Sequence, residues 1–287
     1  MSKLNKQSNQ INEVGKKIAI QGYAGSFHQV AALQYFGNET TIVPCATFRE
    51  LIKLAANKKE THGGIMAIEN SIAGSILPNY ILLQKSNLHI VGEVYLRIEQ
   101  NLLVYPGVTL NDIKEVHSHP MALLQCLDFL EQHNWKLIET EDTALSAQQI
   151  HKKRSPHIAG IASKLAADLF DLEILASNIH TQKNNYTRFL VLQKDNVEVE
   201  QADKASINFQ TNHTKGSLAK VLSKVSEEGI NLSKLQSMPI AGTNFKYSFH
   251  ADLEFENINQ LNKALKSIEP LTENVKILGI YKNGNVH

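Results

Sequence analysis

Two different patterns of apolar and polar residues divide the chain. From residue 17 to 193, short apolar runs alternate with segments whose apolar residues recur every three or four positions. Runs of the first kind are typical of buried strands, and segments of the second kind are typical of amphipathic helices. This alternation predicts parallel sheets, and the length of the region favours two α/β lobes, the second at about 100–170. The expected strands lie at 17–21, 41–43, 64–68, 88–98, 101–105, 115–117, 135–139, 158–162 and 186–192.

The pattern changes after residues 194–204, a charged segment nearly free of bulky apolar residues that we interpret as a linker. Strands are expected at 205–209, 232–240, 245–253 and 275–281, with helices at 218–225 and 258–268. Tyr247, Phe249 and Ala251 alternate with polar residues, as in a half-buried antiparallel strand. The order βαββαβ predicts a ferredoxin-like unit over 205–282.

Candidate chemistry begins where a polar loop, Asn184-Asn185, runs into the apolar strand 186–192. Thr187 and Arg188 stand at the start of that strand, and ligands of open α/β folds bind at such strand ends. A guanidinium suits a carboxylate ligand because it donates two parallel hydrogen bonds. The plainer alternative is a strand start that carries an ordinary surface arginine.

Two further segments place polar groups at strand ends. Glu69-Asn70-Ser71 follows the apolar run 64–68, where either a site or a capped turn is consistent with the residue types. The turn 22–26 separates a strand from a helix, and the free N–H groups of a helix start bind anions. This turn lacks both the dinucleotide fingerprint and the Walker lysine.

The segment from 118 to 130 is expected to be a helix that begins near Pro120. Ser118 and Gln125 are seven residues apart, so they share one helix face, which meets either solvent or a cleft. His117 and His119 stand two apart on a strand, but no third ligand occurs at a suitable spacing. We therefore expect no metal site.

Composition narrows the class of protein. The 287 residues are 43% hydrophobic and 20% charged with a net charge of +1, which gives no basic excess for nucleic acid or a membrane surface. Cys45 and Cys126 form no C-x-x-C pair, which fits a reducing compartment. Residues 1–16 are polar and lack the apolar core of a signal peptide, so we expect a disordered tail and a cytoplasmic protein.

Four short motifs follow one another in a fixed order. They are Gly22-x-x-Gly25-Ser26-Phe27, then Ile68-Glu69-Asn70-Ser71 with Gly74, then Ser118-His119-Pro120 with Gln125-Cys126, and finally Asn185-x-Thr187-Arg188-Phe189. Each motif is weak alone, but their order and spacing resemble those of the prephenate dehydratases, over roughly 17–282. Residues 205–282 resemble an ACT regulatory domain. His28 and Met121 depart from the family pattern, in which Ser and Gln are common at these positions.

This resemblance implies a catalytic domain at 17–193 with the architecture of a periplasmic binding protein, whose two α/β lobes enclose the site. The implied reaction removes carbon dioxide and hydroxide from prephenate and gives phenylpyruvate on the route to L-phenylalanine. Gain of an aromatic ring drives the elimination, so no cofactor is expected. The resemblance implies the catalytic residues Thr187, Arg188, Asn70, Ser118 and Gln125, and the substrate-binding residues Gly25, Ser26, Phe27, Glu69, Ser71, His119 and Phe189.

Among these residues, Thr187 is expected to donate a hydrogen bond to the leaving oxygen. Arg188 and the N–H groups of Ser26 and Phe27 are expected to hold the charge of the substrate. Glu69 is a candidate source of the proton that leaves with the hydroxide.

The ACT-like region implies allosteric inhibition by L-phenylalanine, bound between subunits of a homodimer or homotetramer. The residues implied at the effector site are Gly216, Ser217, Leu218, Ala219, Asn231, Leu232, Gln236 and Ser237. Gln236 and Met238 replace the charged residues of the family pattern Glu-Ser-Arg-Pro, which leaves the effector open, and a purely structural dimerisation domain is the alternative. For the whole chain the alternatives are an arogenate dehydratase and a non-catalytic module that binds small anions or amino acids.

Overall fold

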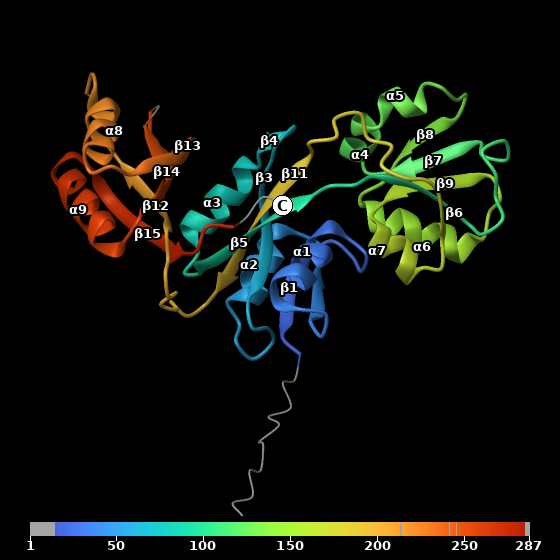
Figure 1. Cartoon of the computed structure of the whole chain (residues 1–287), viewed down its shortest axis with the longest axis horizontal. Coiled ribbons are helices and arrows are strands. Elements are labelled where there is room, and N and C mark those ends of the chain that lie inside the picture. The colour runs from blue at the N-terminus through green and yellow to red at the C-terminus, as the bar shows by residue number, and fades with distance from the viewer. Residues whose placement is uncertain (1–14, 213, 241, 245, 285–287) are drawn as a thin grey trace, which may run out of the picture.

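The computed structural model describes residues 15–212, 214–240, 242–244 and 246–284. These residues form three sheets in a row, with the first sheet in the middle (Figure 1). The first two sheets belong to a two-lobed part, and the third belongs to a ferredoxin-like C-terminal unit, as the two sequence patterns predict. Of the expected disordered tail, residues 1–14 lie outside the described residues.

The first sheet has the strand order β2-β1-β3-β11-β5, and a short strand, β4, pairs with β3. Strands β1, β2 and β3 are parallel, but β11 runs antiparallel to both β3 and β5. The expectation of parallel sheets is therefore wrong here, because β11 returns from the second lobe and enters the sheet between β3 and β5, starting at the end where β3 finishes. The bounds are β1 Lys17–Gln21, α1 Phe27–Phe36, β2 Thr41–Cys45, α2 Phe48–Ala55, β3 Gly64–Asn70, β4 Gly74–Ser75, α3 Leu77–Lys85, β5 His89–Arg97 and β11 Tyr186–Gln193.

The second sheet forms the other lobe and has the order β10-β6-β9-β7-β8. Strand β6 is antiparallel to β9 and β10, whereas β7 is parallel to β8 and β9. Its elements all lie between β5 and β11 in the chain, so this lobe is inserted into the first. The bounds are β6 Asn101–Val104, β7 Glu115–Ser118, α4 Pro120–Gln125, α5 Leu127–Leu130, β8 Lys136–Glu139, α6 Thr143–Lys153, β9 Ile158–Ala162, α7 Lys164–Leu169 and β10 Glu173–Ala176.

Side-chain caps begin the helices that face the space between the lobes. Ser26 caps α1 by accepting from the N–H of Gln29, and Asp142 caps α6 by accepting from two N–H groups of the first turn. His119 caps α4, so the helix expected from residue 118 begins at Pro120, and Ser118 belongs to strand β7. These caps fix the helix N-termini at the junction of the lobes.

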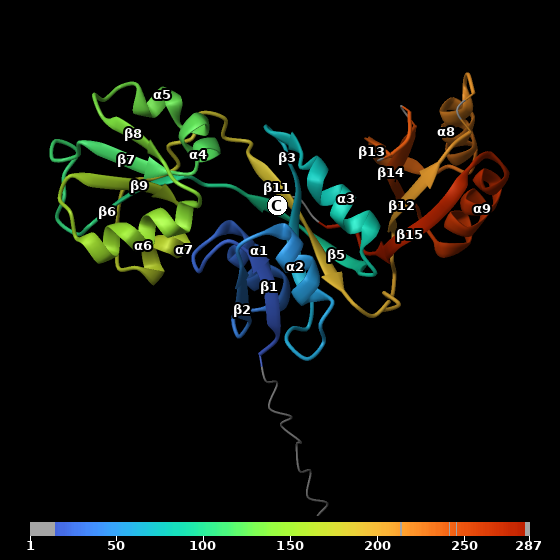
Figure 2. The same cartoon turned by 180° about the vertical axis from the view of Figure 1, so that it is seen from behind.

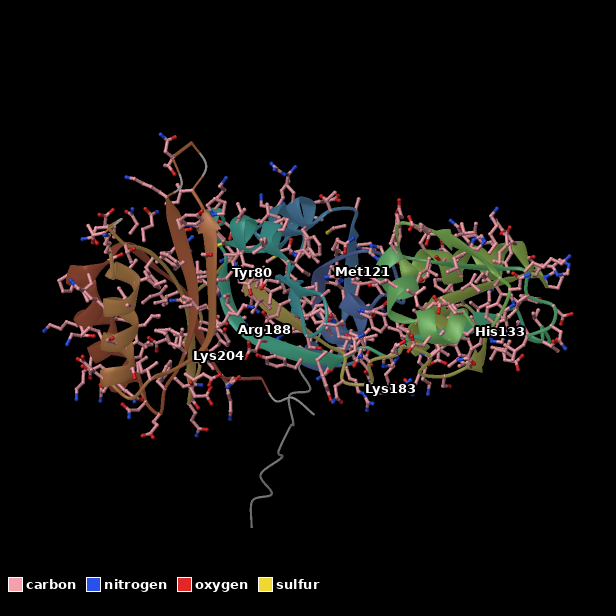
Figure 3. All side chains as sticks on the ribbon, turned by 90° about the horizontal axis from the view of Figure 1, so that it is seen from above. Tyr80, Met121, His133, Lys183, Arg188 and Lys204 are labelled. Atoms are coloured by element: carbon pink, nitrogen blue, oxygen red, sulfur yellow. The ribbon has the colours of Figure 1, made fainter. Side chains whose placement is uncertain are left out.

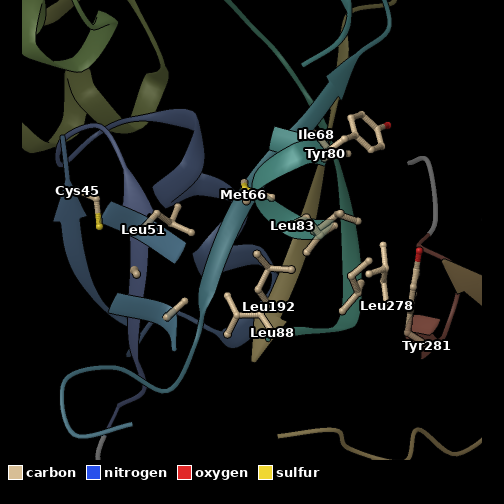
Figure 4. Packing of buried hydrophobic residues seen from close by; sticks show 14 of the residues in the cluster. Cys45, Leu51, Met66, Ile68, Tyr80, Leu83, Leu88, Leu192, Leu278 and Tyr281 are labelled. Atoms are coloured by element: carbon tan, nitrogen blue, oxygen red, sulfur yellow. The ribbon is translucent and has the colours of Figure 1, made fainter. Parts of the chain in front are cut away.

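The C-terminal unit has the sheet order β13-β14-β12-β15 with two helices on one face (Figure 2). Its other face packs on the first lobe, where Leu278 and Tyr281 of β15 join Leu83 and Leu88 in one apolar cluster (Figure 4). Burying such side chains stabilises the contact by about 1.5–3 kcal/mol each. The bounds are β12 Lys204–Gln210, α8 Ser217–Glu227, β13 Asn231–Pro239, β14 Tyr247–Glu254, α9 Ile258–Ile268, η1 Glu269–Leu271 and β15 Glu273–Tyr281.

Candidate active site

A cavity of about 360 Å³ lies where the two lobes and the strands that connect them meet. The first lobe contributes the start of α1 and the end of β3, and the second lobe contributes the starts of α4 and α6. The start of β11 closes it, because β11 is antiparallel and its first residues lie at the C-terminal end of β3. The side chains that line the cavity include Ser26, Phe27, His28, Asn70, Gln100, His119, Gln125, Glu141, Asp142, Thr187 and Phe189.

A hydrogen bond between Asn70 and Thr187 lies at the centre of this cavity. The Nδ2 group of Asn70 donates to Thr187 Oγ1 at 3.0 Å and to Tyr186 O at 3.1 Å. Its Oδ1 accepts from the N–H groups of Ile72 and Ala73, which fixes the direction of the amide. Because Thr187 Oγ1 is an acceptor in this bond, its own proton remains available to a ligand in the cavity.

The network continues to Gln125 through Asn185, a fully buried residue. Asn185 Oδ1 accepts from Asn70 at 2.7 Å, and Asn185 Nδ2 donates to Gln125 Oε1 at 3.0 Å. Gln125 Oε1 also accepts from Gln100 Nε2 at 3.4 Å, so the Gln125 amide N–H groups are left for a ligand. Sequence reasoning assigned a role neither to Gln100, which lines the cavity, nor to Asn185, which lies behind the lining and joins Asn70 to Gln125, although Asn185 belongs to one of the four motifs.

His28 faces the same space from α1. Its Nε2 accepts from the N–H of Ala67 at 3.3 Å, so the neutral ring carries its proton on Nδ1. Burial lowers the pKa of His28 from 6.5 to about 3. The ring packs edge-on against Phe189 with 5.0 Å between centroids. From the sequence, His28 was noted only because it departs from the family pattern, in which Ser is common at this position. Its place in the first turn of α1, two residues after the Ser26 cap, was the feature that could have indicated that it faces the cavity.

Carboxylates supply the fixed charge around the cavity. Glu141 accepts from the Tyr23 hydroxyl of the other lobe at 2.5 Å. Burial raises the pKa of Asp142, against the effect of the two N–H groups that it accepts. Among the described residues that line the cavity there is no lysine or arginine. The positive end of α1, which a neutral serine caps, therefore provides the positive electrostatic potential that an anionic ligand needs.

Arg188 does not lie in the cavity, contrary to the expectation that it holds the substrate. Consecutive strand residues point to opposite faces, so Thr187 faces the cavity and Arg188 faces the C-terminal unit. Its side chain is 3% exposed, and it donates to Glu93 at 2.7 Å and to Asp252 at 2.5 Å. Figure 3 places Arg188 near Lys204, between the first sheet and the C-terminal unit.

Four other expected positions also lie apart from the cavity lining, namely Glu69, Ser71, Ser118 and Gly25. Glu69 forms an ion pair with Lys234 of the C-terminal unit, which corrects its expected role as the proton source. Ser118 is completely buried and donates to Ile161 O at 2.6 Å, because it ends strand β7 and does not lie on the helix face expected for it. Ser71 is exposed and ties the turn after β3 to the loop before β11.

The first motif forms part of the lobe junction. Gly25 has φ +89°, and a Cβ atom there would lie 2.9 Å from the Cα of Ala166 in the other lobe. Its carbonyl accepts from Ser163 Oγ at 2.6 Å, also across the junction. The N–H of Ser26 donates to Tyr23 O, so it is not available to the substrate as expected.

The residues expected at the effector site lie on two elements of the C-terminal unit. Gly216, in the left-handed region at φ +77°, precedes α8, which begins with Ser217, Leu218 and Ala219. Asn231, Leu232, Gln236 and Ser237 lie on β13. Nowhere in the described part of the chain do three His, Cys, Asp or Glu side chains gather closely enough to hold a metal ion. No helix among the described residues has the length and apolar character needed to cross a membrane.

Comparison with known proteins gives a consistent result. A family model described as prephenate dehydratase matches residues 18–197. An arogenate dehydratase/prephenate dehydratase from Arabidopsis thaliana is 36% identical over 282 residues, which cover 92% of this chain and 71% of the relative.

Two solved structures share the fold over 93% of this chain. One is a prephenate dehydratase from Arthrobacter aurescens in complex with L-phenylalanine, with a TM-score of 0.83, 25% identity and 90% of that chain covered. The other is GqqA, described as a novel type of quorum-quenching acylase, with a TM-score of 0.85, 30% identity and 98% of that chain covered. The family model covers more than half of the chain, and the Arabidopsis relative is matched over most of its own length. The chain therefore belongs to the prephenate dehydratase family.

Proposed function

We propose that this chain converts prephenate to phenylpyruvate, the activity of its family, with Thr187 as the donor to the leaving oxygen. The observation that carries this proposal is the hydrogen bond from Asn70 to Thr187 Oγ1, which leaves the hydroxyl proton of Thr187 free to be donated to a ligand. In the reaction, the bond to the ring carboxylate breaks and its electrons form the aromatic ring. The ring hydroxyl leaves and, with a proton, becomes water.

The cavity offers a group for each part of the substrate. The Gln125 amide N–H groups and the N-terminus of α1 are suited to its two carboxylates. Phe27 and Phe189 provide an apolar wall against the ring. Placing one donor where charge develops lowers the barrier by about 3–4 kcal/mol. The test is phenylpyruvate formation by the purified chain, and absence of turnover on prephenate would refute the assignment of the substrate.

Arogenate is a second candidate substrate, and the carboxylates of the cavity favour it. Arogenate carries an ammonium group where prephenate carries a ketone, and Glu141 and Asp142 are the acidic side chains among the described residues that line the cavity. If the ammonium binds there, Glu141→Gln lowers kcat/KM for arogenate more than for prephenate. Equal effects on both substrates would contradict this placement.

Amide hydrolysis, suggested by the acylase relative, requires a nucleophile next to a base. Each histidine ring of the cavity already accepts a backbone hydrogen bond, His28 from Ala67 and His119 from Met121. Among the described lining residues, no hydroxyl bonds to either ring. This arrangement favours elimination, and assaying the wild-type chain on acyl amides provides the comparison.

We also propose that the C-terminal unit is an ACT domain that binds L-phenylalanine and lowers turnover, in a cytoplasmic homodimer or homotetramer. Helix α8 has eleven residues and follows Gly216, whose position lacks a side chain, so its N-terminus is suited to an amino-acid carboxylate. The test is calorimetry at millimolar L-phenylalanine beside the turnover assay, with sedimentation for the number of subunits. Neither heat nor a change in rate would leave this unit as a dimerisation domain.

A further inference from the structure

The end of β3 and the start of β11, which are joined by the hydrogen bond between Asn70 and Thr187, each carry two neighbouring residues that point to opposite faces of the sheet. Strand β3 ends in Glu69-Asn70, and β11 begins with Tyr186-Thr187-Arg188, in the register Asn70 opposite Thr187 and Glu69 opposite Arg188. Asn70 and Thr187 meet in the cavity. Glu69 and Arg188 both reach the C-terminal unit.

The Arg188 contact is buried and balanced in charge. Its Nη1 group donates to Asp252 of β14 at 2.5 Å, and Lys204 donates to the other side of Glu93 at 2.9 Å. Two cations and two anions thus share an interior in which the side chains of Arg188, Glu93 and Asp252 are at most 3% exposed. Ser206 and His250 each donate to the second carboxylate oxygen of Asp252, so its position is fixed from within the C-terminal unit.

The Glu69 contact is closer to solvent. Lys234 of β13 pairs with Glu69 and donates to Ser75 at 2.8 Å, with side-chain exposures of 20% for Lys234 and 25% for Glu69. Lys234 therefore ties the end of β3 and the strand β4 beside it to the C-terminal unit. The two contacts hold neighbouring strand ends from the face opposite the cavity.

We propose that the C-terminal unit forms part of the support of the active site: Lys234 and Asp252 act, through Glu69 and Arg188, as positioning residues for Asn70 and Thr187. This inference rests on the proposed role of Thr187. A shift of about 1 Å at a catalytic group lowers the rate by about a hundredfold. Glu69 is one covalent link from Asn70, and Arg188 is one from Thr187, so movement of the C-terminal unit reaches both partners of the hydrogen bond.

A charge exchange at the more exposed pair tests the inference. Glu69→Lys and Lys234→Glu each place like charges in contact, and we expect kcat on prephenate to fall about tenfold while KM stays within about twofold. The double variant restores the pair in reverse and should bring kcat back to within about threefold of wild type.

The matched control is Lys276→Met. Lys276 also joins the two units, by donating to Gln84 O and Ser86 O, but it lies away from the ends of β3 and β11. This variant should keep wild-type kcat. Single variants at Glu69 and Lys234 with wild-type kcat, or a double variant no better than the singles, would overturn the inference.

A second measurement separates this inference from the proposed function. Amide hydrogen exchange at residues 69–71 and 186–189 should be faster in either single variant and return to the wild-type rate in the double variant. Suppose that Thr187→Val loses turnover, but that neither kcat nor the rate of amide hydrogen exchange changes when the charges of Glu69 and Lys234 are reversed. The proposed function then stands, and the support by the C-terminal unit is wrong. If Thr187→Val keeps its turnover, while amide hydrogen exchange is faster in the single charge variants and normal in the double variant, the support stands and the role of Thr187 is wrong.

Discussion

Thr187→Val removes the hydroxyl that the proposed mechanism requires and keeps the branched shape of the side chain. In the structure Asn70 Nδ2 donates to three oxygens, and the substitution leaves Asn185 Oδ1 and Tyr186 O as acceptors. The amide of Asn70 therefore keeps its orientation, and the free energy of unfolding should fall by only about 0.5–1.5 kcal/mol, the contribution of one hydrogen bond.

The effect on catalysis should be much larger than the effect on stability. Loss of a donor aimed at developing charge corresponds to about 3–4 kcal/mol of transition-state stabilisation, so kcat should fall by about 10²–10³. The assay is phenylpyruvate formation at saturating prephenate, beside urea unfolding of the same preparation. Thr187→Ser retains the hydroxyl and should keep at least about a tenth of the activity. A valine variant within about threefold of wild type would refute the donor role.

Three further changes have expected outcomes. Asp252→Ala leaves the buried Arg188 with one acidic partner and should lower the free energy of unfolding by about 3–5 kcal/mol in urea titrations. The pKa of His28 is about 3 in the folded chain and 6.5 in the unfolded chain, so between these pH values the unfolded chain binds more protons. The stability that is present above pH 6.5 is therefore lost as the pH falls. At pH 5 this loss should be about 2 kcal/mol relative to pH 7, and a His28→Gln variant whose unfolding curves show the same slope with pH would contradict it. Gly25→Ala introduces a Cβ atom 2.9 Å from the Cα of Ala166 at a positive φ, so the contact between the lobes should loosen. The free energy of unfolding, measured by thermal unfolding, should fall by about 1–3 kcal/mol. Unchanged thermal unfolding would count against close contact of the lobes.

Much of the cavity was predictable because its residues stand at strand ends and helix starts. The Asn70, Thr187 and Gln125 side chains line it together, as do Ser26 at the α1 cap and His119 at the α4 cap. Local patterns are sufficient for such positions because the ends of neighbouring elements meet in an α/β fold. The roles of these residues in catalysis remain predictions.

The errors arise where a side chain had to be assigned to a face. Thr187 and Arg188 are neighbours on a strand, so they cannot both face one cavity, and the same rule separates Asn70 from Glu69. The sequence therefore contained the signal against Arg188, but not the identity of its partner, because Asp252 follows 64 residues later in another unit. Ser118 was assigned to the helix that follows it, although it is the last residue of strand β7, and its burial depends on contact with β9.

The position of β11 in the first sheet sets the order in which the chain can assemble. This strand lies between β3 and β5, yet every element of the second lobe precedes it in the chain. During synthesis the inserted lobe can therefore acquire its own core while the first sheet still has an open seam between two exposed strand edges. Such edges pair readily with other chains. The hydrogen bond between Asn70 and Thr187 can form only when β11 fills that seam, so completion of the cavity and protection from aggregation are the same folding event.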